Sequence, residues 1–221
     1  MSEPITAAAP IRIGVRVNDL TLLLLDADLR AVESFALGGK TSADGNVWLT
    51  NVAAESGLDR SRLTFRKHYT IPAHPVAEGA AFSRDIHNDL AELTRYSSNA
   101  STVLEDLARN TPAASQVRTW PHHFDIATLI EVPSVTDARR TIGVGHSPGD
   151  DSYAEPYWYV GPYPYPPVDQ LPPLAAGHWH TKGWVGAALP ATEYVRNADQ
   201  RATVLAFIDS AVAGCRVLLG D

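Results

Sequence analysis

The spacing of apolar residues changes along the chain, and this change constrains the fold more than any other feature. From Ile11 to Ile71 the apolar residues form short alternating or β-branched runs, which are typical of strands. From Ser83 onward they recur every three or four residues, which is the period of an amphipathic helix. A second stretch with this period lies near the C-terminus. The sequence therefore predicts an α+β fold: a largely antiparallel sheet with one long central helix and a C-terminal helix packed on it.

These patterns place all elements in a single predicted domain of residues 1–221. Four short segments, IRIGVRV, TLLLLDADL, NVWLT and RLTFRKHYTI, are expected to form a β meander. The piece NVAAESGL, residues 51–58, could add one or two helical turns between strands. The predicted regions are the meander over 11–71, the long helix over 83–109, an aromatic and histidine-rich β region over 120–190 and the final helix over 197–215.

Composition and charge exclude several classes of protein. The 18 basic and 25 acidic residues give a net charge of −7, and no basic stripe is present that would bind nucleic acid. The longest apolar run near the start, Leu22 to Leu25, is too short for a membrane span or a signal peptide. The single cysteine, Cys215, cannot form an internal disulfide and lies among apolar residues, so we expect it to be buried. We predict a soluble, cytoplasmic protein without nucleic-acid or membrane partners.

Aromatic residues are concentrated in one region. Four of the five tryptophans and five of the eight tyrosines lie between Trp120 and Trp184. In an extended chain Tyr157 and Tyr159 share one strand face and Trp158 takes the other. Such rings stack on sugars, nucleobases or cations, but they also stabilise a core strand, and the core interpretation is favoured for this run. The candidate ligand-binding residues are Trp120, Tyr157, Tyr159 and Trp179.

Two histidine pairs suggest a metal site. In the segments WPHHFD (120–125) and GHWHT (177–181), extended backbone would put His123 and Asp125 on one face, and His178 and His180 on one face. If the two segments are neighbouring strands, their side chains could bind Zn, Mn or Fe. The alternative is a packed layer of rings that bond to the backbone. The candidate metal ligands are His122, His123, Asp125, His178 and His180, and the candidate catalytic carboxylates are Asp150 and Glu155.

The segment GHSPG, residues 145–149, matches the G-x-S-x-G pattern of serine hydrolases. The residue after the serine must donate its backbone N–H to the oxyanion hole, and Pro148 has none. Proline followed by glycine is typical of a turn. We therefore predict a turn at Ser147 and no nucleophile there.

The segments WPHHFD, SPGDDSYAEPYWYVGPYP and GHWHTKGWVGA resemble a bacterial family of uncharacterised proteins, a domain of unknown function. Its members carry Trp-Pro-His-His-Phe-Asp, then Ser-Pro-Gly-Asp, then Pro-Tyr-x-Tyr. The resemblance covers mainly residues 115–190 and implies no reaction, cofactor or catalytic residue. Two hypotheses follow: a pocket that binds a small molecule or partner without turnover, which we favour, and a divalent-metal-dependent hydrolase acting on a small molecule.

Overall fold

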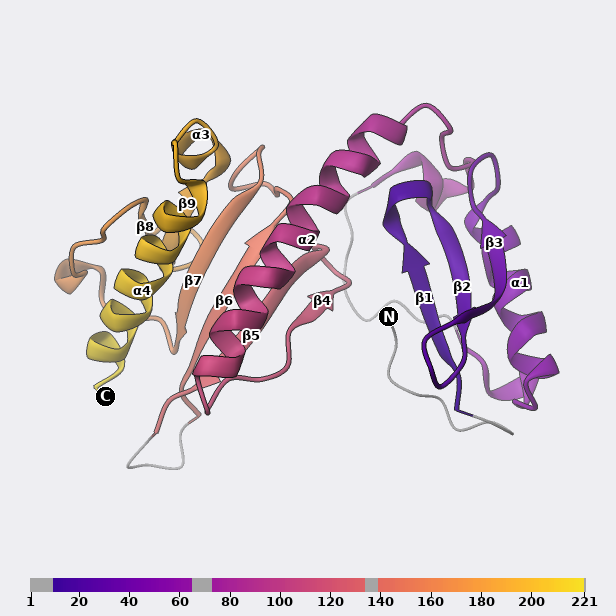
Figure 1. Ribbon diagram of the computed structural model, residues 1–221, viewed down its shortest axis with the longest axis horizontal. Coiled ribbons are helices and arrows are strands. Elements are labelled where there is room, and N and C mark those ends of the chain that lie inside the picture. Colours follow the sequence, from indigo (N-terminus) through magenta and orange to yellow (C-terminus); the bar gives the residue numbers. More distant parts are fainter. Residues whose placement is uncertain (1–9, 65–72, 134–138, 221) are drawn as a thin grey trace. The chain divides into compact units, whose positions relative to one another are not determined.

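The structure is a computed structural model that describes residues 10–64, 73–133 and 139–220 (Figure 1). The chain divides into two compact units, Met1–Arg95 and Tyr96–Asp221. The predicted α+β class is confirmed, with its antiparallel sheet, its long helix and its C-terminal helix. The prediction that residues 1–221 form a single domain stays a prediction.

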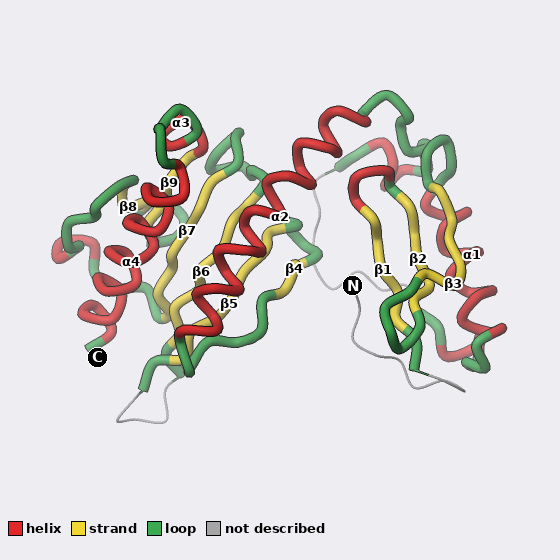
Figure 2. The backbone as a smooth tube through the Cα atoms, viewed as in Figure 1, coloured by secondary structure: helices red, strands yellow, loops and turns green. Residues whose placement is uncertain are grey.

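The first unit contains a three-stranded antiparallel sheet in the order β1-β2-β3, together with one longer helix (Figure 2). Ile11, Leu24 and Val52 form its buried cluster, against which Trp48 packs. The first two predicted strands of the meander are confirmed. The elements are β1 (Arg12–Arg16), β2 (Thr21–Leu25), β3 (Ala31–Ala36) and α1 (Ser42–Glu55).

The prediction of a strand at NVWLT is wrong, because this segment lies inside α1. The helix begins with a capping box: the Thr41 side chain accepts the Asp44 N–H, and the Asp44 carboxylate accepts the Thr41 N–H at 2.8 Å. These bonds satisfy N–H groups at the helix start, so the helix begins before NVWLT and continues through it. Of the predicted strand RLTFRKHYTI, Arg62 belongs to a short 3₁₀ turn (Arg60–Arg62) and most of the rest lies outside the described residues.

The second unit is built on a six-stranded antiparallel sheet in the order β4-β5-β6-β7-β9-β8. The long helix α2 runs along the chain from the first unit into the second, and α4 is the predicted C-terminal helix. Asp199 caps α4 by accepting the Ala202 N–H at 2.8 Å. The elements are α2 (His87–Asn110), β4 (Arg118–Trp120), β5 (Asp125–Glu131), β6 (Thr141–Ser147), β7 (Tyr157–Tyr163), β8 (His178–His180), β9 (Gly186–Pro190), α3 (Ala191–Tyr194) and α4 (Gln200–Leu219).

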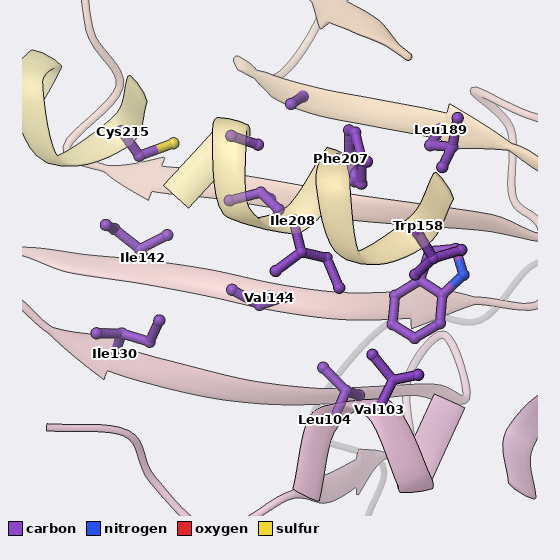
Figure 3. Packing of buried hydrophobic residues seen from close by; sticks show 14 of the residues in the cluster. Val103, Leu104, Ile130, Ile142, Val144, Trp158, Leu189, Phe207, Ile208 and Cys215 are labelled. Carbon is purple, nitrogen blue, oxygen red and sulfur yellow. The ribbon is translucent and has the colours of Figure 1, made fainter. Parts of the chain in front are cut away.

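One face of this sheet carries the hydrophobic core. Figure 3 shows Ile142 and Val144 of the sheet beside Phe207 and Ile208 of α4, with Leu104 of α2 completing the cluster. The length and composition of α4 would allow it to cross a membrane, and its buried residues, among them Phe207 and Ile208, pack on the sheet. Cys215, also on α4, is fully buried, and burial raises the pKa of its thiol to about 12, so its predicted structural role is supported.

The other face of the sheet, which we call the distal face, points away from α4. Because side chains alternate along a strand, it receives the neighbours of the core residues. Trp158 and Val160 belong to the core, so Tyr157, Tyr159 and Gly161 point to the distal face. The predicted division of Tyr157 and Tyr159 from Trp158 is therefore confirmed.

Candidate functional site

A pocket of about 350 Å³ lies on the distal face of the second unit. Gly143 of β6 and Gly161 of β7 line it and are partners in the strand register. A Cβ atom at Gly161 would meet no atom within 4 Å, and one at Gly143 would lie 3.6 Å from the Leu129 side chain. Two facing positions without side chains therefore create the hollow, which is how glycine in a strand makes room for a ligand.

Two tyrosine–carboxylate pairs form the polar end of the pocket. The hydroxyl of Tyr159 donates to Oδ2 of Asp125, and the hydroxyl of Tyr157 donates to Oδ2 of Asp150 at 2.6 Å. Burial, together with the neighbouring carboxylates, raises the pKa of both phenols well above 10. Both tyrosines therefore remain neutral donors, and each holds one carboxylate in the pocket wall.

A third glycine allows Tyr159 to reach Asp125 across the sheet. Tyr159 and Gly145 are register partners on β7 and β6, and Gly145 in turn faces Ala127 on β5. A Cβ atom at Gly145 would lie 2.5 Å from Cζ of Tyr159 and 2.8 Å from Cβ of Ala127. The tyrosine ring thus lies directly over the glycine, and any side chain at this position would displace it.

Asp150 is held by the turn that follows β6. Its Oδ1 atom accepts the backbone N–H of Ser152 at 2.7 Å and of Tyr153 at 3.2 Å. Gly149 has a φ of +123°, and its N–H donates to the Ser147 hydroxyl at 3.2 Å. Ser147 is buried, and the next regular element after it is β7 rather than a helix. Of the segment GHSPG, residues 145–147 belong to β6 and the chain bends at Pro148, so the predicted change of direction comes just after Ser147.

Most of the rest of the pocket wall is aromatic or apolar, and its other polar residues are His122, His123, Ser147 and Thr141. Trp184 stacks on Tyr157, with ring centroids 6.5 Å apart, and on His180, with centroids 4.3 Å apart. Sequence reasoning did not single out Trp184 as a ligand-binding residue. The end of the pocket away from the carboxylates is lined by Leu129, Pro162, Tyr163, Tyr165 and Val185.

His122 and His123 both line the pocket, but not in the way that the sequence predicted. The expected alternation of His123 and Asp125 against His122 is wrong because residues 121–124 form a turn between β4 and β5, not extended strand. Phe124 has a φ of +60°, and its N–H donates to the Trp120 carbonyl at 2.9 Å. The turn brings the two imidazole rings to 4.7 Å from each other, edge to face.

His178 and His180 share one face of β8, as predicted, and both contact the Tyr153 hydroxyl. The distances are 2.9 Å to Nε2 of His178 and 3.1 Å to Nδ1 of His180. Nε2 of His180 lies 2.6 Å from the Lys182 carbonyl, which can only accept, so this nitrogen carries the proton. The Tyr153 hydroxyl thus lies between Nε2 of His178 and Nδ1 of His180, and Nδ1 of His178 lies 3.5 Å from Oε1 of Glu193.

The structure does not make the two histidine segments neighbours. β4 and β8 form opposite edges of the sheet, and β6, β7 and β9 lie between β5 and β8. Among residues 10–64, 73–133 and 139–220, no group of three or more His, Cys, Asp or Glu side chains is placed to hold a metal ion. Binding of Zn, Mn or Fe stays a prediction.

Three other predicted residues lie outside the pocket wall. Trp179 points toward the core, where its indole N–H donates to the Pro172 carbonyl at 2.6 Å. Trp120 is exposed on β4. Glu155 accepts the Thr192 N–H at 2.8 Å and the Thr192 hydroxyl at 2.9 Å, so it holds the start of α3.

Of the predicted residues, the structure thus gathers His122, His123, Asp125, Asp150, Tyr157 and Tyr159 around one pocket. The three glycines at positions 143, 145 and 161 were not recognised from sequence. A signal was present, because glycines alternate with other residues in TIGVGHS (141–147), and the aromatic run YWYVG (157–161) follows after a short loop. No family model matches the chain, and the searches of curated proteins and of solved structures found no match.

Proposed function

We propose that this protein binds a small organic molecule in the distal-face pocket. The observation that carries the proposal is the hollow over Gly143 and Gly161, which is walled by aromatic rings and by two carboxylates held by tyrosines. Its volume of about 350 Å³ falls in the range of roughly 300 to 1,000 Å³ that is usual for ligand sites. Polar groups at one end and apolar groups at the other would orient a ligand.

Binding without turnover is favoured because the candidate catalytic groups already have structural partners. Glu155 is bonded to Thr192, and Asp150 is bonded to Tyr157 and to two backbone N–H groups. His180 is bonded through both of its nitrogens. The metal-dependent hydrolase therefore remains the second hypothesis, and no described contact favours it. The cytoplasmic location, the lack of nucleic-acid and membrane partners and the family resemblance stay predictions.

The substitution Gly161→Val tests the pocket directly. A Cβ atom there meets no atom within 4 Å and valine suits a strand, so the variant should fold normally while its side chain fills the hollow. We expect a screen of a fragment library by ligand-observed NMR to find fragments that bind the wild type but not Gly161→Val. The matched control is Ser34→Val, which introduces the same valine side chain at an exposed position of β3. If every fragment that binds the wild type binds Gly161→Val equally well, the proposal is overturned.

A further inference from the structure

We infer that the ligand of this pocket is an organic cation, with an ammonium group at one end and an apolar body at the other. This inference rests on the proposed binding function and names the class of ligand. It follows from the charge, the aromatic walls and the shape of the pocket, which are independent features of the distal face.

The charge of the pocket wall is negative. It contains the carboxylates of Asp125 and Asp150, and within the described residues neither a lysine nor an arginine lines it. The groups that hold these carboxylates are neutral hydroxyl and N–H donors, which orient a charge without cancelling it. Arg118 lies opposite Ala127 in the register of β4 with β5 and is not among the residues that line the pocket. An anionic ligand would therefore meet two like charges.

Asp125 also has an unused acceptor. Its Oδ1 atom is shielded from solvent and has no hydrogen-bond partner in the described part of the chain. A buried carboxylate oxygen without a donor is unfavourable, because it has lost its hydration without compensation. A nearby ammonium group would offset this loss by its charge.

The aromatic walls suit the same ligand. The ring of Tyr157 stacks on Trp184 and is tilted against Tyr159, with centroids 6.1 Å apart in the latter pair. Because burial keeps both phenols protonated, the rings carry no charge of their own. The electron-rich faces of such rings attract ammonium groups.

The shape of the pocket adds the apolar body. The carboxylates lie at one end, and the glycine floor separates them from the other end, where Leu129, Pro162 and Val185 lie with Thr141 as a polar neighbour among the described lining residues. A ligand with a charged group near Asp125 and Asp150 can therefore place its remaining atoms over Gly161 and against these apolar side chains. A small phenylalkyl amine has these properties.

Three probes of the same size test the charge preference: 3-phenylpropylamine, 3-phenylpropan-1-ol and 3-phenylpropionate. Titrations at pH 8 keep the amine protonated, since the pKa of an alkylammonium group is about 10.4, and lie above the range in which imidazole ordinarily titrates. We expect the amine to bind at least about tenfold more tightly than the alcohol, and the carboxylate to bind more weakly still.

The variants Asp125→Asn and Asp150→Asn remove each charge. Asp125→Asn keeps an oxygen that accepts the Tyr159 hydroxyl. In Asp150→Asn the amide oxygen can still accept the Ser152 and Tyr153 N–H groups, and the amide nitrogen then donates to the Tyr157 hydroxyl oxygen. Each should weaken binding of the amine about tenfold and leave binding of the alcohol unchanged. The matched control is Asp209→Asn, which removes an exposed charge from α4, on the opposite face of the sheet. Thermal melts of all three variants establish that they are folded.

The outcomes separate this inference from the proposed function. If the alcohol or the carboxylate binds as tightly as the amine, and Gly161→Val abolishes that binding, the pocket is confirmed and the cation inference is wrong. If none of the three probes binds, the test uses the fragments that bind the wild type but not Gly161→Val. The inference is supported if most of these fragments are cationic, and it is overturned if most are neutral or anionic. If no fragment is sensitive to Gly161→Val, both proposals fail.

Discussion

The buried imidazole of His146 should make the second unit less stable in mild acid. His146 lies on the core face of β6 with 3% of its surface exposed, stacked on Tyr96 and edge-on to Trp158. Its Nε2 atom has no hydrogen-bond partner among the described residues. Burial lowers its pKa from 6.5 to about 4, because the core cannot solvate a charged ring.

The direction of the effect follows from proton binding. Between pH 6.5 and about 4 the unfolded chain binds a proton at His146 that the folded chain does not. The free energy of unfolding therefore falls as the pH is lowered through this window, and the loss is complete below about pH 4. With these two pKa values the loss between pH 7 and pH 5 is about 2 kcal/mol, and the full loss is about 3 kcal/mol.

Denaturant unfolding of the wild type and of His146→Phe at pH 7 and pH 5 measures this loss. The phenylalanine keeps an aromatic ring against Tyr96 and Trp158 but cannot bind a proton. Tryptophan fluorescence follows the relevant transition, since four of the five tryptophans lie in this unit. The wild type should lose about 2 kcal/mol more than the variant, because all other titrating groups contribute equally to both.

Equal pH dependence of the two proteins would refute the reasoning. A second measurement applies even if the variant does not fold. NMR titration of the wild-type histidine rings should show one imidazole that stays neutral down to about pH 5, as expected for a pKa of about 4. Protonation of every imidazole near pH 6.5 in the folded protein would place His146 outside the core.

Two further predictions concern the glycines of β6 and the cap of α1. Gly145→Ala should destabilise the protein by about 1–3 kcal/mol and weaken ligand binding, because its Cβ atom would displace Tyr159, whereas Gly143→Ala, whose Cβ atom has normal contacts, should change stability by less than about 0.5 kcal/mol. Thermal melts of both variants check this, and equal stabilities would contradict it. Thr41→Ala removes the Thr41–Asp44 capping box and should lower the stability of the first unit by about 1 kcal/mol in denaturant unfolding. An unchanged midpoint would show that the cap does not stabilise α1.

Local chemistry alone determined several elements of this protein. The helical spacing of apolar residues predicted α2 over 83–109 and α4 over 197–215, and the structure has them at His87–Asn110 and Gln200–Leu219. Strand alternation separated Tyr157 and Tyr159 from Trp158, and proline followed by glycine at positions 148 and 149 predicted that the chain changes direction there. These features depend on residues a few positions apart, so they can be read from the chain.

Two local predictions failed because a nearby signal was stronger. The run NVWLT has the composition of a strand, but the capping box of Thr41 and Asp44 begins a helix just before it. The alternation expected at His122 and His123 failed because the chain turns there instead of remaining extended. In both places the tendency of a short segment was overridden by the hydrogen bonds of its neighbours.

Only the tertiary structure decided which distant residues meet. The strand order places β8 at the edge beyond β9, and this separates His178 and His180 from Asp125 although both segments lie in one sheet. The register of β6 with β7 sets Gly143 opposite Gly161 and Tyr159 over Gly145, which creates the pocket. Strand order and register depend on pairing between segments far apart in the chain and on the packing of a shared core, and no local spacing encodes them.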